Sequence, residues 1–381
     1  MTRISVILPV YNAHPYLSVC LGSLLEQTQR DIRVIAIDDG STDGSDRVLA
    51  AAAEVDARVC VVSRENRGLI ATLNEGLGLA DSDMVARMDA DDIAFPDRFA
   101  AQLEAFAARR DLGVLGTNFT TIFAPARMAP SAAPMLTAPG ERAILGRFCT
   151  PLRHPTVMFR RASLGAEDLV YDPAYPDAED FDLFRRLARR SAIAETGTPH
   201  LAYRLHAGSV SATRVSQMVQ THLRILEENL TRYYPQAAGT GVERIGVLAD
   251  GAAVDAAADL IRRLDGLALR QPDAERAAFE TGVNTTVHFL FALLCRVGEY
   301  GLAHDFIDRA DRWRSIRRRE RAVLQTRLAP AGMAMSEWLV DLQRWRNSRL
   351  LAQDLPGYAE IMAKARMIER VAGQTQARHA G

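Results

Sequence analysis

The sequence predicts an α/β protein with a mostly parallel sheet flanked by helices, followed by an α-helical region. In the first half of the chain, short runs rich in β-branched residues alternate with amphipathic segments, which is typical of βαβ units. After about residue 214 the chain becomes rich in Ala, Leu and Arg and carries few strand signals, which indicates helices. We therefore expect one domain over residues 1–212 and a helical domain over residues 213–381.

The individual elements follow from periodicity. Residues 4–9 form an apolar run that fits a buried strand, and Leu69, Leu73 and Leu77 share one face of a helix. Strands are predicted over residues 4–9, 32–37, 59–63, 84–88, 112–117 and 154–161. Helices are predicted over residues 16–26, 44–53, 69–80, 96–108 and 179–190. The Pro- and Ala-rich residues 124–140 predict a loop or a lid.

The composition excludes several classes of protein. The chain has 46 basic and 47 acidic residues and a net charge of −1, so no global field attracts nucleic acid, and no nucleic-acid partner is expected. Four widely spaced cysteines form neither a zinc motif nor a disulfide framework. The longest apolar run, Phe289–Cys295, is much shorter than the about 20 residues that cross a bilayer. We expect a cytoplasmic protein, with peripheral attachment to the inner face of the membrane as a further option.

Three carboxylates follow the fourth predicted strand, in the segment Asp89-Ala90-Asp91-Asp92. Alternate residues of an extended chain face the same side, so Asp89 and Asp91 should lie together. Like charges at this spacing repel unless a cation or hydroxyl groups compensate them. One or two carboxylates together with substrate phosphates commonly hold Mg²⁺ or Mn²⁺. The segment therefore predicts a site for a metal ion and phosphate groups.

A second acidic pair, Glu179-Asp180, begins the helix predicted over residues 179–190. The helix dipole favours acidic side chains in the first turn, so a structural role is one interpretation. A carboxylate near a metal–diphosphate site could equally act as a general base. The residues alone leave both interpretations open.

In their order and spacing, these motifs resemble those of family 2 glycosyltransferases, which have the nucleotide-diphospho-sugar transferase (GT-A) fold. The resemblance covers about residues 3–211, a little over half of the chain. The matching segments are residues 5–12, 38–43, 65–68, 89–92, 154–155, 159–161, 179–180 and 203–206.

The resemblance implies roles for individual residues. It assigns the nucleotide-sugar donor to Pro9, Tyr11, Asn12, Asp39, Asn66, Arg67, Asp89, Ala90, His154, Arg204, His206 and Ser211. It assigns a divalent metal, Mn²⁺ or Mg²⁺, to Asp91, Asp89 and His206. Tyr11, Asp39 and Arg67 would border the base, and the segment from Arg204 to Ser211 would close over the diphosphate. For His154, a purely structural role stays equally open.

The resemblance also implies the chemistry. Asp180 would deprotonate the acceptor hydroxyl with support from Glu179, and the sugar would be transferred by direct displacement with inversion. Residues 1–117 would bind the nucleotide sugar, expected to be a UDP-sugar, and residues 118–212 would face the acceptor. A glycan or lipid-linked acceptor in cell-surface polysaccharide or glycolipid assembly is expected. The alternative is a non-catalytic protein that binds a nucleotide sugar or a partner on the same fold.

The helical region carries no motif that indicates chemistry. Its basic run includes Arg317, Arg318 and Arg319 beside the apolar Trp313 and Ile316. Three roles stay open for this run: a solvated basic face, peripheral contact with an anionic membrane, or a contact in a homo-oligomer.

Overall fold

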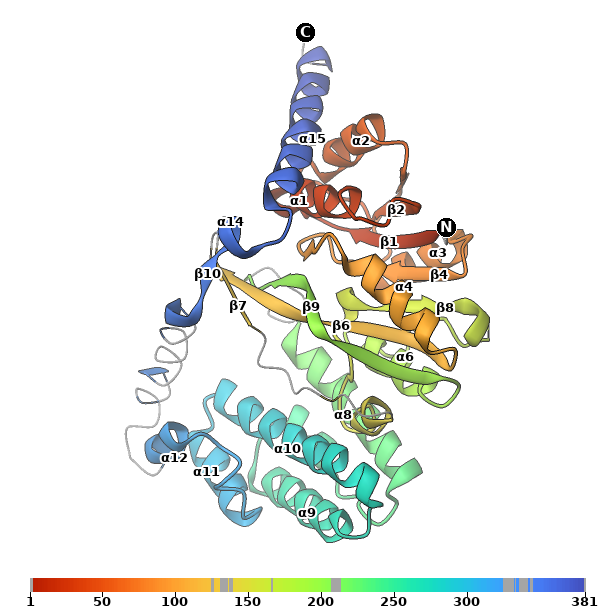
Figure 1. The fold of residues 1–381 in the computed structure, drawn as a ribbon. Helices are drawn as coiled ribbons and strands as arrows, with labels where there is room; N and C mark the ends of the chain where they lie inside the picture. Colours follow the sequence, from red (N-terminus) through yellow and green to blue (C-terminus); the bar gives the residue numbers. More distant parts are fainter. Residues whose placement is uncertain are drawn as a thin grey trace.

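One mixed β-sheet with helices on both faces forms the centre of the molecule, and a helical domain lies beside it (Figure 1). The structure is a computed structural model, and it describes residues 3–124, 127–130, 136, 140–165, 167–206, 214–324, 332, 334, 335, 342 and 345–379. The sheet has the strand order β10-β7-β6-β8-β4-β1-β2-β3, with β9 paired to β5 and β6.

The strands are β1 (Ile4–Val10), β2 (Ile32–Asp38), β3 (Val59–Ser63), β4 (Met84–Arg87), β5 (Ile93–Ala94), β6 (Leu112–Ala124), β7 (Arg127–Pro130), β8 (Met158–Arg160), β9 (Ala192–Arg204) and β10 (Arg349–Leu350). The α-helices are α1 (His14–Leu25), α2 (Ser45–Val55), α3 (Leu69–Leu79), α4 (Arg98–Ala108), α5 (Glu141–Leu145), α6 (Glu179–Leu187), α8 (Val215–Tyr233), α9 (Gly251–Ala268), α10 (Asp273–Arg296), α11 (Tyr300–Arg309), α12 (Arg318–Leu324), α14 (Leu351–Asp354) and α15 (Tyr358–His379). Short 3₁₀ helices are η1 (His154–Thr156), η2 (Arg161–Ser163) and η3 (Val242–Gly246).

The strands β4, β1, β2 and β3 are parallel, as predicted. Val6 and Leu8 of β1 point into the core formed with α1, α2 and α4, whereas Ile7 points to the opposite core, with α3 and α6. Both faces are thus buried, which explains the continuous apolar runs in these strands. Because the strands are parallel, their carboxyl ends meet at one edge of the sheet, and the residues that follow each strand are neighbours there.

The other side of the sheet departs from the predicted pattern. The strand β9 was not predicted, because Gly197 and Pro199 interrupt its sequence. Irregularities in its parallel pairing with β6 accommodate these residues. The predicted strand over residues 154–161 is η1 followed by β8, which pairs antiparallel with β4. Within the predicted loop, residues 127–130 form β7, and residues 125–126, 131–135 and 137–139 lie outside the described residues.

The helices α8 to α12 pack around a hydrophobic core of their own. Among the described residues one helix, α10, is long and apolar enough to cross a membrane by length and composition. Half of its apolar window is buried inside the molecule, and Phe279, Val287 and Leu290 belong to the core shared with α9 and α11. Core helices that span no membrane pass the same test, so α10 is a weak candidate.

The last part of the chain returns to the sheet. β10 pairs antiparallel with β7, and α15 packs on α1 and α2, at the end of the molecule farthest from the helical domain (Figure 1). Ile361 and Ile368 of α15 are fully buried, and the Ser18 hydroxyl donates a hydrogen bond of 2.6 Å to Glu369. The division of the chain at residue 212 stays a prediction, and the structure adds that β10, α14 and α15 pack against the first domain.

Candidate active site

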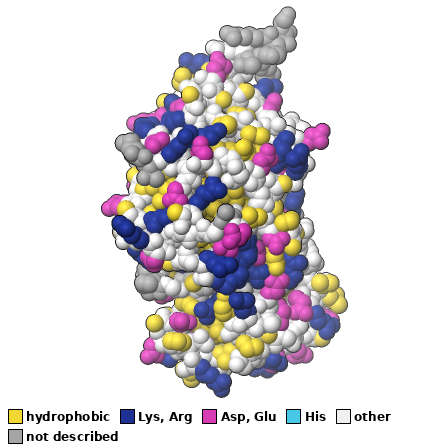
Figure 2. All heavy atoms as spheres, turned by 90° about the vertical axis from the view of Figure 1, so that its right-hand side faces the viewer, with side chains coloured by type: hydrophobic (Ala, Val, Ile, Leu, Met, Phe, Trp, Pro, Cys, Tyr) yellow, Lys and Arg dark blue, Asp and Glu magenta, His cyan; other side chains and the backbone are white. Residues whose placement is uncertain are grey.

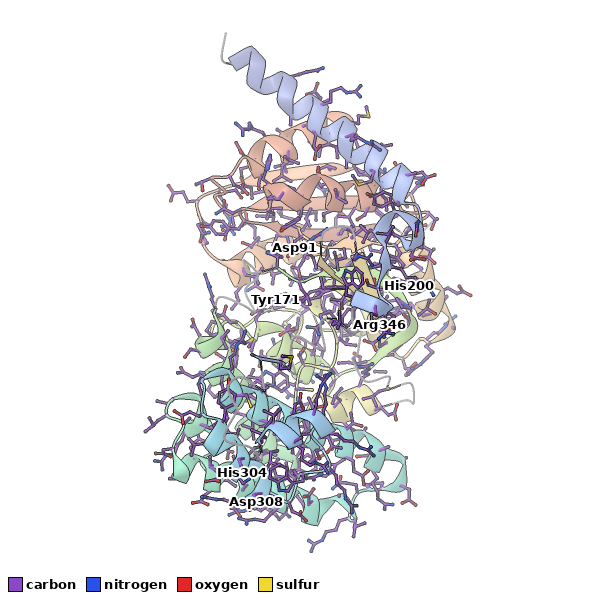
Figure 3. The ribbon with its side chains drawn as sticks, turned by 90° about the vertical axis from the view of Figure 1, so that its left-hand side faces the viewer. Asp91, Tyr171, His200, His304, Asp308 and Arg346 are labelled. Atoms are coloured by element: carbon purple, nitrogen blue, oxygen red, sulfur yellow. The ribbon has the colours of Figure 1, made fainter. Side chains whose placement is uncertain are left out.

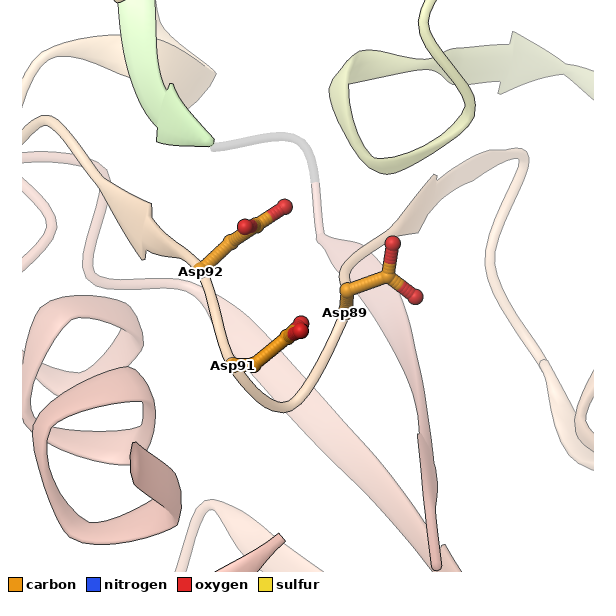
Figure 4. Close-up of side chains that lie close together, drawn as sticks. All are labelled: Asp89, Asp91 and Asp92. Carbon is orange, nitrogen blue, oxygen red and sulfur yellow. The ribbon is translucent and has the colours of Figure 1, made fainter. Parts of the chain in front are cut away.

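The turn that follows β4 brings three carboxylates together (Figure 4). One oxygen from each of Asp89, Asp91 and Asp92 lies within 4.8 Å of the others. Asp92 is fully buried, and its Oδ1 accepts a hydrogen bond of 2.8 Å from the backbone N–H of Arg204. Its Oδ2 is buried and has no hydrogen-bond partner among the described residues. A buried carboxylate oxygen without a donor is costly, and a cation at this atom would remove that cost.

Electrostatics also indicate a cation at this turn. Burial raises the pKa of Asp92 well above its usual value, and repulsion from Asp91 and Asp89 raises it further. Burial likewise raises the pKa of Asp89, although Arg87 opposes the change. A divalent cation would relieve both effects, and oxygen ligands are those that Mg²⁺ and Mn²⁺ prefer. The residues present therefore fit a divalent metal.

The end of β9 reaches the same turn. The Arg204 Nε–H donates a hydrogen bond of 2.7 Å to the carbonyl of Asp91, and His206 Nε2 lies 2.8 Å from Asp91 Oδ2. The Tyr16 ring supports both, since the Arg204 guanidinium lies 4.6 Å and the His206 ring 5.1 Å from its centroid. The structure thus brings Arg204 and His206 to the acidic turn, and Ala90 is buried within that turn. Ser211 lies outside the described residues.

The carboxyl ends of β2 and β3 meet through Asp39. Its carboxylate accepts hydrogen bonds from the backbone N–H groups of Arg67 and Gly68, at 2.8 and 2.9 Å, and forms a buried ion pair with Arg64. Gly40 is required here, because a Cβ on it would lie 2.9 Å from the backbone N of Asn66. Asp39 therefore shapes the turn, while the side chains of Asn66 and Arg67 are exposed. The sequence analysis missed Arg64, whose partner lies 25 residues away.

The end of β1 offers an exposed aromatic ring. Pro9 pairs with Ile37 within the sheet, and the Tyr11 side chain is 56% exposed. Asn12 adopts the left-handed conformation (φ 50°), and its Oδ1 accepts a hydrogen bond of 2.8 Å from the backbone N–H of Thr42. The Asn12 side chain thus joins the turns after β1 and β2, and the Tyr11 ring remains available to stack on a base.

The second acidic pair lies at the start of α6. Asp180 Oδ2 accepts a hydrogen bond of 3.2 Å from the Thr150 hydroxyl, and Oδ1 accepts one of 2.7 Å from the backbone N–H of Phe181. Burial raises the pKa of Asp180, and burial together with the charge of Asp180 raises the pKa of Glu179 to about 8. Asp180 has hydrogen-bond donors that stabilise its carboxylate, whereas a pKa of about 8 keeps Glu179 protonated near neutral pH.

His154 lies between this pair and a buried tyrosine. Its Nε2 is 2.7 Å from the Tyr171 hydroxyl, and its Nδ1 is 3.9 Å from Glu179 Oε1. Burial and the nearby Arg87 hold the pKa of His154 well below its usual value, so the imidazole is neutral. Asp91 and Tyr171 lie in the middle of the molecule, between the first strands and the helical domain (Figure 3). These contacts favour the structural interpretation of His154, as a support for Glu179.

Arg87 is the second residue that the sequence analysis missed. Its guanidinium is buried and forms two short contacts with Asp89, of 2.5 and 2.6 Å. Its charge also acts on Glu179 and Asp180, since it opposes the increase in the pKa of each. Arg87 thus connects the two acidic groups electrostatically. An arginine inside an apolar strand, two residues before Asp89 and on the same face, was the signal that could have revealed it.

Comparison with known proteins agrees with this architecture. Residues 5–165 match the family model for glycosyl transferase family 2. An uncharacterized glycosyltransferase of Haemophilus influenzae is 29% identical over 248 residues, which cover 60% of this chain and 74% of the relative. The putative glycosyltransferase EpsH of Bacillus subtilis is 28% identical over 235 residues, which cover 59% of this chain and 67% of the relative.

A solved structure shares the fold. The crystal structure of S. aureus TarS 1-349 in complex with UDP-GlcNAc aligns over 82% of this chain and 91% of that chain, with a TM-score of 0.51 and 16% identity. This likeness concerns the fold, which is the GT-A arrangement of a mixed sheet flanked by helices. Residues 5–165 are thus similar to glycosyltransferases of family 2, and the fold of the chain agrees with this match.

Proposed function

We propose that the protein is an inverting, metal-dependent glycosyltransferase that moves one sugar from a nucleotide-diphospho-sugar to an acceptor hydroxyl. One observation carries this proposal. The carboxylate triad after β4, in which the buried Oδ2 of Asp92 has no partner among the described residues, lies near another carboxylate, the half-buried Asp180, whose charge raises the pKa of Asp89. An inverting transfer needs these two groups: a cation site for the leaving diphosphate and a separate base for the acceptor.

We propose a UDP-sugar as the donor. The exposed Tyr11 ring at the end of β1 offers a stacking surface for a base, beside the turns that Asp39 organises. The TarS structure with the same fold was solved in complex with UDP-GlcNAc, which supports this class of donor. The carboxyl ends of parallel strands are where such sheets bind ligands.

When bound, the metal supplies charge stabilisation for the diphosphate that leaves. Asp91 and Asp89 would hold it, with His206 beside Asp91. Asp180 accepts the proton of the acceptor hydroxyl as the new C–O bond forms at the anomeric carbon. The bond from that carbon to the phosphate oxygen breaks, and its electron pair leaves with the nucleoside diphosphate. Glu179 stays protonated, and Thr150 orients Asp180.

The setting of the reaction rests on the sequence. A glycan or lipid-linked acceptor, a cytoplasmic location and peripheral contact with the inner face of the membrane all remain proposals. The structure provides evidence on the proposed membrane contact. Ile316 is buried in the core of the helical domain, and Trp313 packs against the same core. A membrane contact there would depend on the arginines of the basic run rather than on these two apolar residues.

Asp180→Asn tests the proposal. General-base help is worth about 10²–10⁴-fold, so release of nucleoside diphosphate from the UDP-sugar should fall by about that factor while UDP binding with Mn²⁺, followed by calorimetry, stays unchanged. Asp46→Asn is the matched control, because Asp46 also lies in the first turn of a helix but is exposed. A loss of UDP affinity as large as the loss of rate would refute the assignment of Asp180 as the base.

A further inference from the structure

One arginine near the candidate active site, Arg153, has no hydrogen-bond or ion-pair partner among the described residues. Its side chain is exposed. Its Cζ lies 5.0 Å from the ring centroids of both Phe119 and Tyr203. These rings also pack against one another, at 5.9 Å and in an edge-to-face arrangement. Cation–π contacts thus fix the guanidinium while its N–H groups remain available.

Three other arginines near the site have hydrogen-bond or ion-pair partners. Arg87 is paired with Asp89, Arg204 donates to the carbonyl of Asp91, and Arg142 is paired with Glu195. Arg153 differs from these three because its N–H groups have no acceptor among the described residues. A guanidinium with free, fixed donors is suited to bind a phosphate or carboxylate through two parallel hydrogen bonds.

Arg153 is connected to the candidate base, Asp180, through the segment of chain that carries it. It belongs to a loop that also carries Thr150, which donates to Asp180, and His154, which lies beside Glu179. The carbonyl of Arg153 accepts hydrogen bonds from the N–H and the hydroxyl of Thr156, at 2.9 and 2.7 Å, so the backbone of this loop is fixed. The charge of Arg153 is among those that oppose the increase in the pKa of Asp180.

We propose that Arg153 binds an oxyanion, a phosphate or a carboxylate, carried by the acceptor close to the hydroxyl that receives the sugar. The acceptor would then be an acidic or phosphate-bearing glycan. This inference rests on the proposed function, because it takes Asp180 as the group that faces the acceptor. Without Arg153, an anionic acceptor would be repelled by Asp89, Asp91 and Asp180.

The test uses calorimetry on the full chain, saturated with UDP and Mn²⁺, with glucose 6-phosphate and glucuronate as charged probes and glucose as the neutral one. The charged probes should bind the wild type at least about 10-fold more tightly than glucose, and Arg153→Met should weaken them by about 10- to 100-fold. Arg153→Lys keeps the charge and should lose less. Arg270→Met, an exposed arginine in the turn after α9, is the control and should change nothing.

Two results would overturn the inference. One is equal binding of charged and neutral probes by the wild type. The other is a loss of UDP affinity in Arg153→Met with unchanged affinity for the probes, which would make the donor diphosphate the anion bound by Arg153. The probes are also titrated without UDP. A protein that fails to bind UDP would count against the proposed function, and the titrations without UDP would still test whether Arg153 binds the charged probes.

Discussion

Arg87 illustrates how one side chain can organise a site from within the sheet. It is buried at the end of β4, holds Asp89 through two short contacts, and places a positive charge near Glu179 and Asp180. Two acidic groups so close would otherwise repel one another. A buried arginine can keep both in place without occupying the space that a substrate needs.

Replacement of Arg87 should therefore be costly. Arg87→Met leaves the Asp89 carboxylate without its partner, and the free energy of unfolding should fall by about 3 kcal/mol, as measured by urea denaturation. Arg87→Lys retains the charge and should lose less. Arg67→Met removes an exposed guanidinium and should stay within about 0.5 kcal/mol of the wild type. An Arg87→Met protein as stable as the wild type would contradict the role assigned to this residue.

Glu179 gives a prediction that depends on pH. The pKa of Glu179 is about 8 in the folded protein, and the reference value for the unfolded chain is 4.5. Between these two pH values the folded state keeps a proton that the unfolded chain releases. The stability of the wild type should consequently fall as pH rises from about 4.5 to 8 and then level off. Gln does not titrate, so the melting temperature of Glu179→Gln should gain at least about 2 °C on the wild type over this window. Parallel curves for the two proteins would contradict the raised pKa.

At the scale of elements, the return of α15 to the first domain is the feature that sequence periodicity could not reveal. Its contact with α1 depends on a close approach at Gly22, where a Cβ would lie 2.7 Å from the carbonyl oxygen of Ile361 and 3.3 Å from the N of Ala365. The cores on the two faces of the sheet are otherwise formed by strands and helices of successive βαβ units. Their hydrophobic pattern can therefore be recognised within a short stretch of sequence. A helix that packs against residues more than 300 positions away in the sequence leaves no local signal of that contact.

Gly22→Ala tests this packing. The added methyl group should separate α15 from α1 and reduce the free energy of unfolding by about 1–3 kcal/mol, as measured in urea. Gly78→Ala is the matched control, because Gly78 also lies in a helix but a Cβ there meets nothing within 4 Å. It should stabilise the protein by about 0.5–1 kcal/mol, since alanine favours the helix. Equal effects of the two changes would contradict the close contact.

Much of the site could be predicted because its residues follow strands. Asp39 and Asp89–Asp92 come directly after apolar runs, and parallel strands bring such positions to one edge. The partners of these residues could not be predicted in the same way. Arg64, Arg87 and Arg153 act through contacts across the fold, and β9 was hidden by Gly197 and Pro199. Pairing of side chains depends on tertiary structure, which periodicity does not report.

At the scale of the whole molecule, the 46 basic and 47 acidic residues nearly balance. Figure 2 shows basic and acidic side chains interspersed on one face, in agreement with the net charge of −1. Strong local electric fields arise instead at the candidate active site, because the carboxylates of the β4 turn and of α6 are buried or half-buried there. This arrangement favours a substrate that brings its own cation, such as a metal-bound diphosphate.

The most direct test of the account is release of nucleoside diphosphate from a panel of UDP-, dTDP- and GDP-sugars, with Mn²⁺ and with EDTA. Water can replace the acceptor in a slow hydrolysis, so the assay needs no knowledge of the acceptor. The account predicts release from a UDP-sugar with Mn²⁺ and its loss in EDTA. Release that is equally fast in EDTA would contradict the metal site, and neither release nor binding of any nucleotide sugar with Mn²⁺ would contradict the transferase itself.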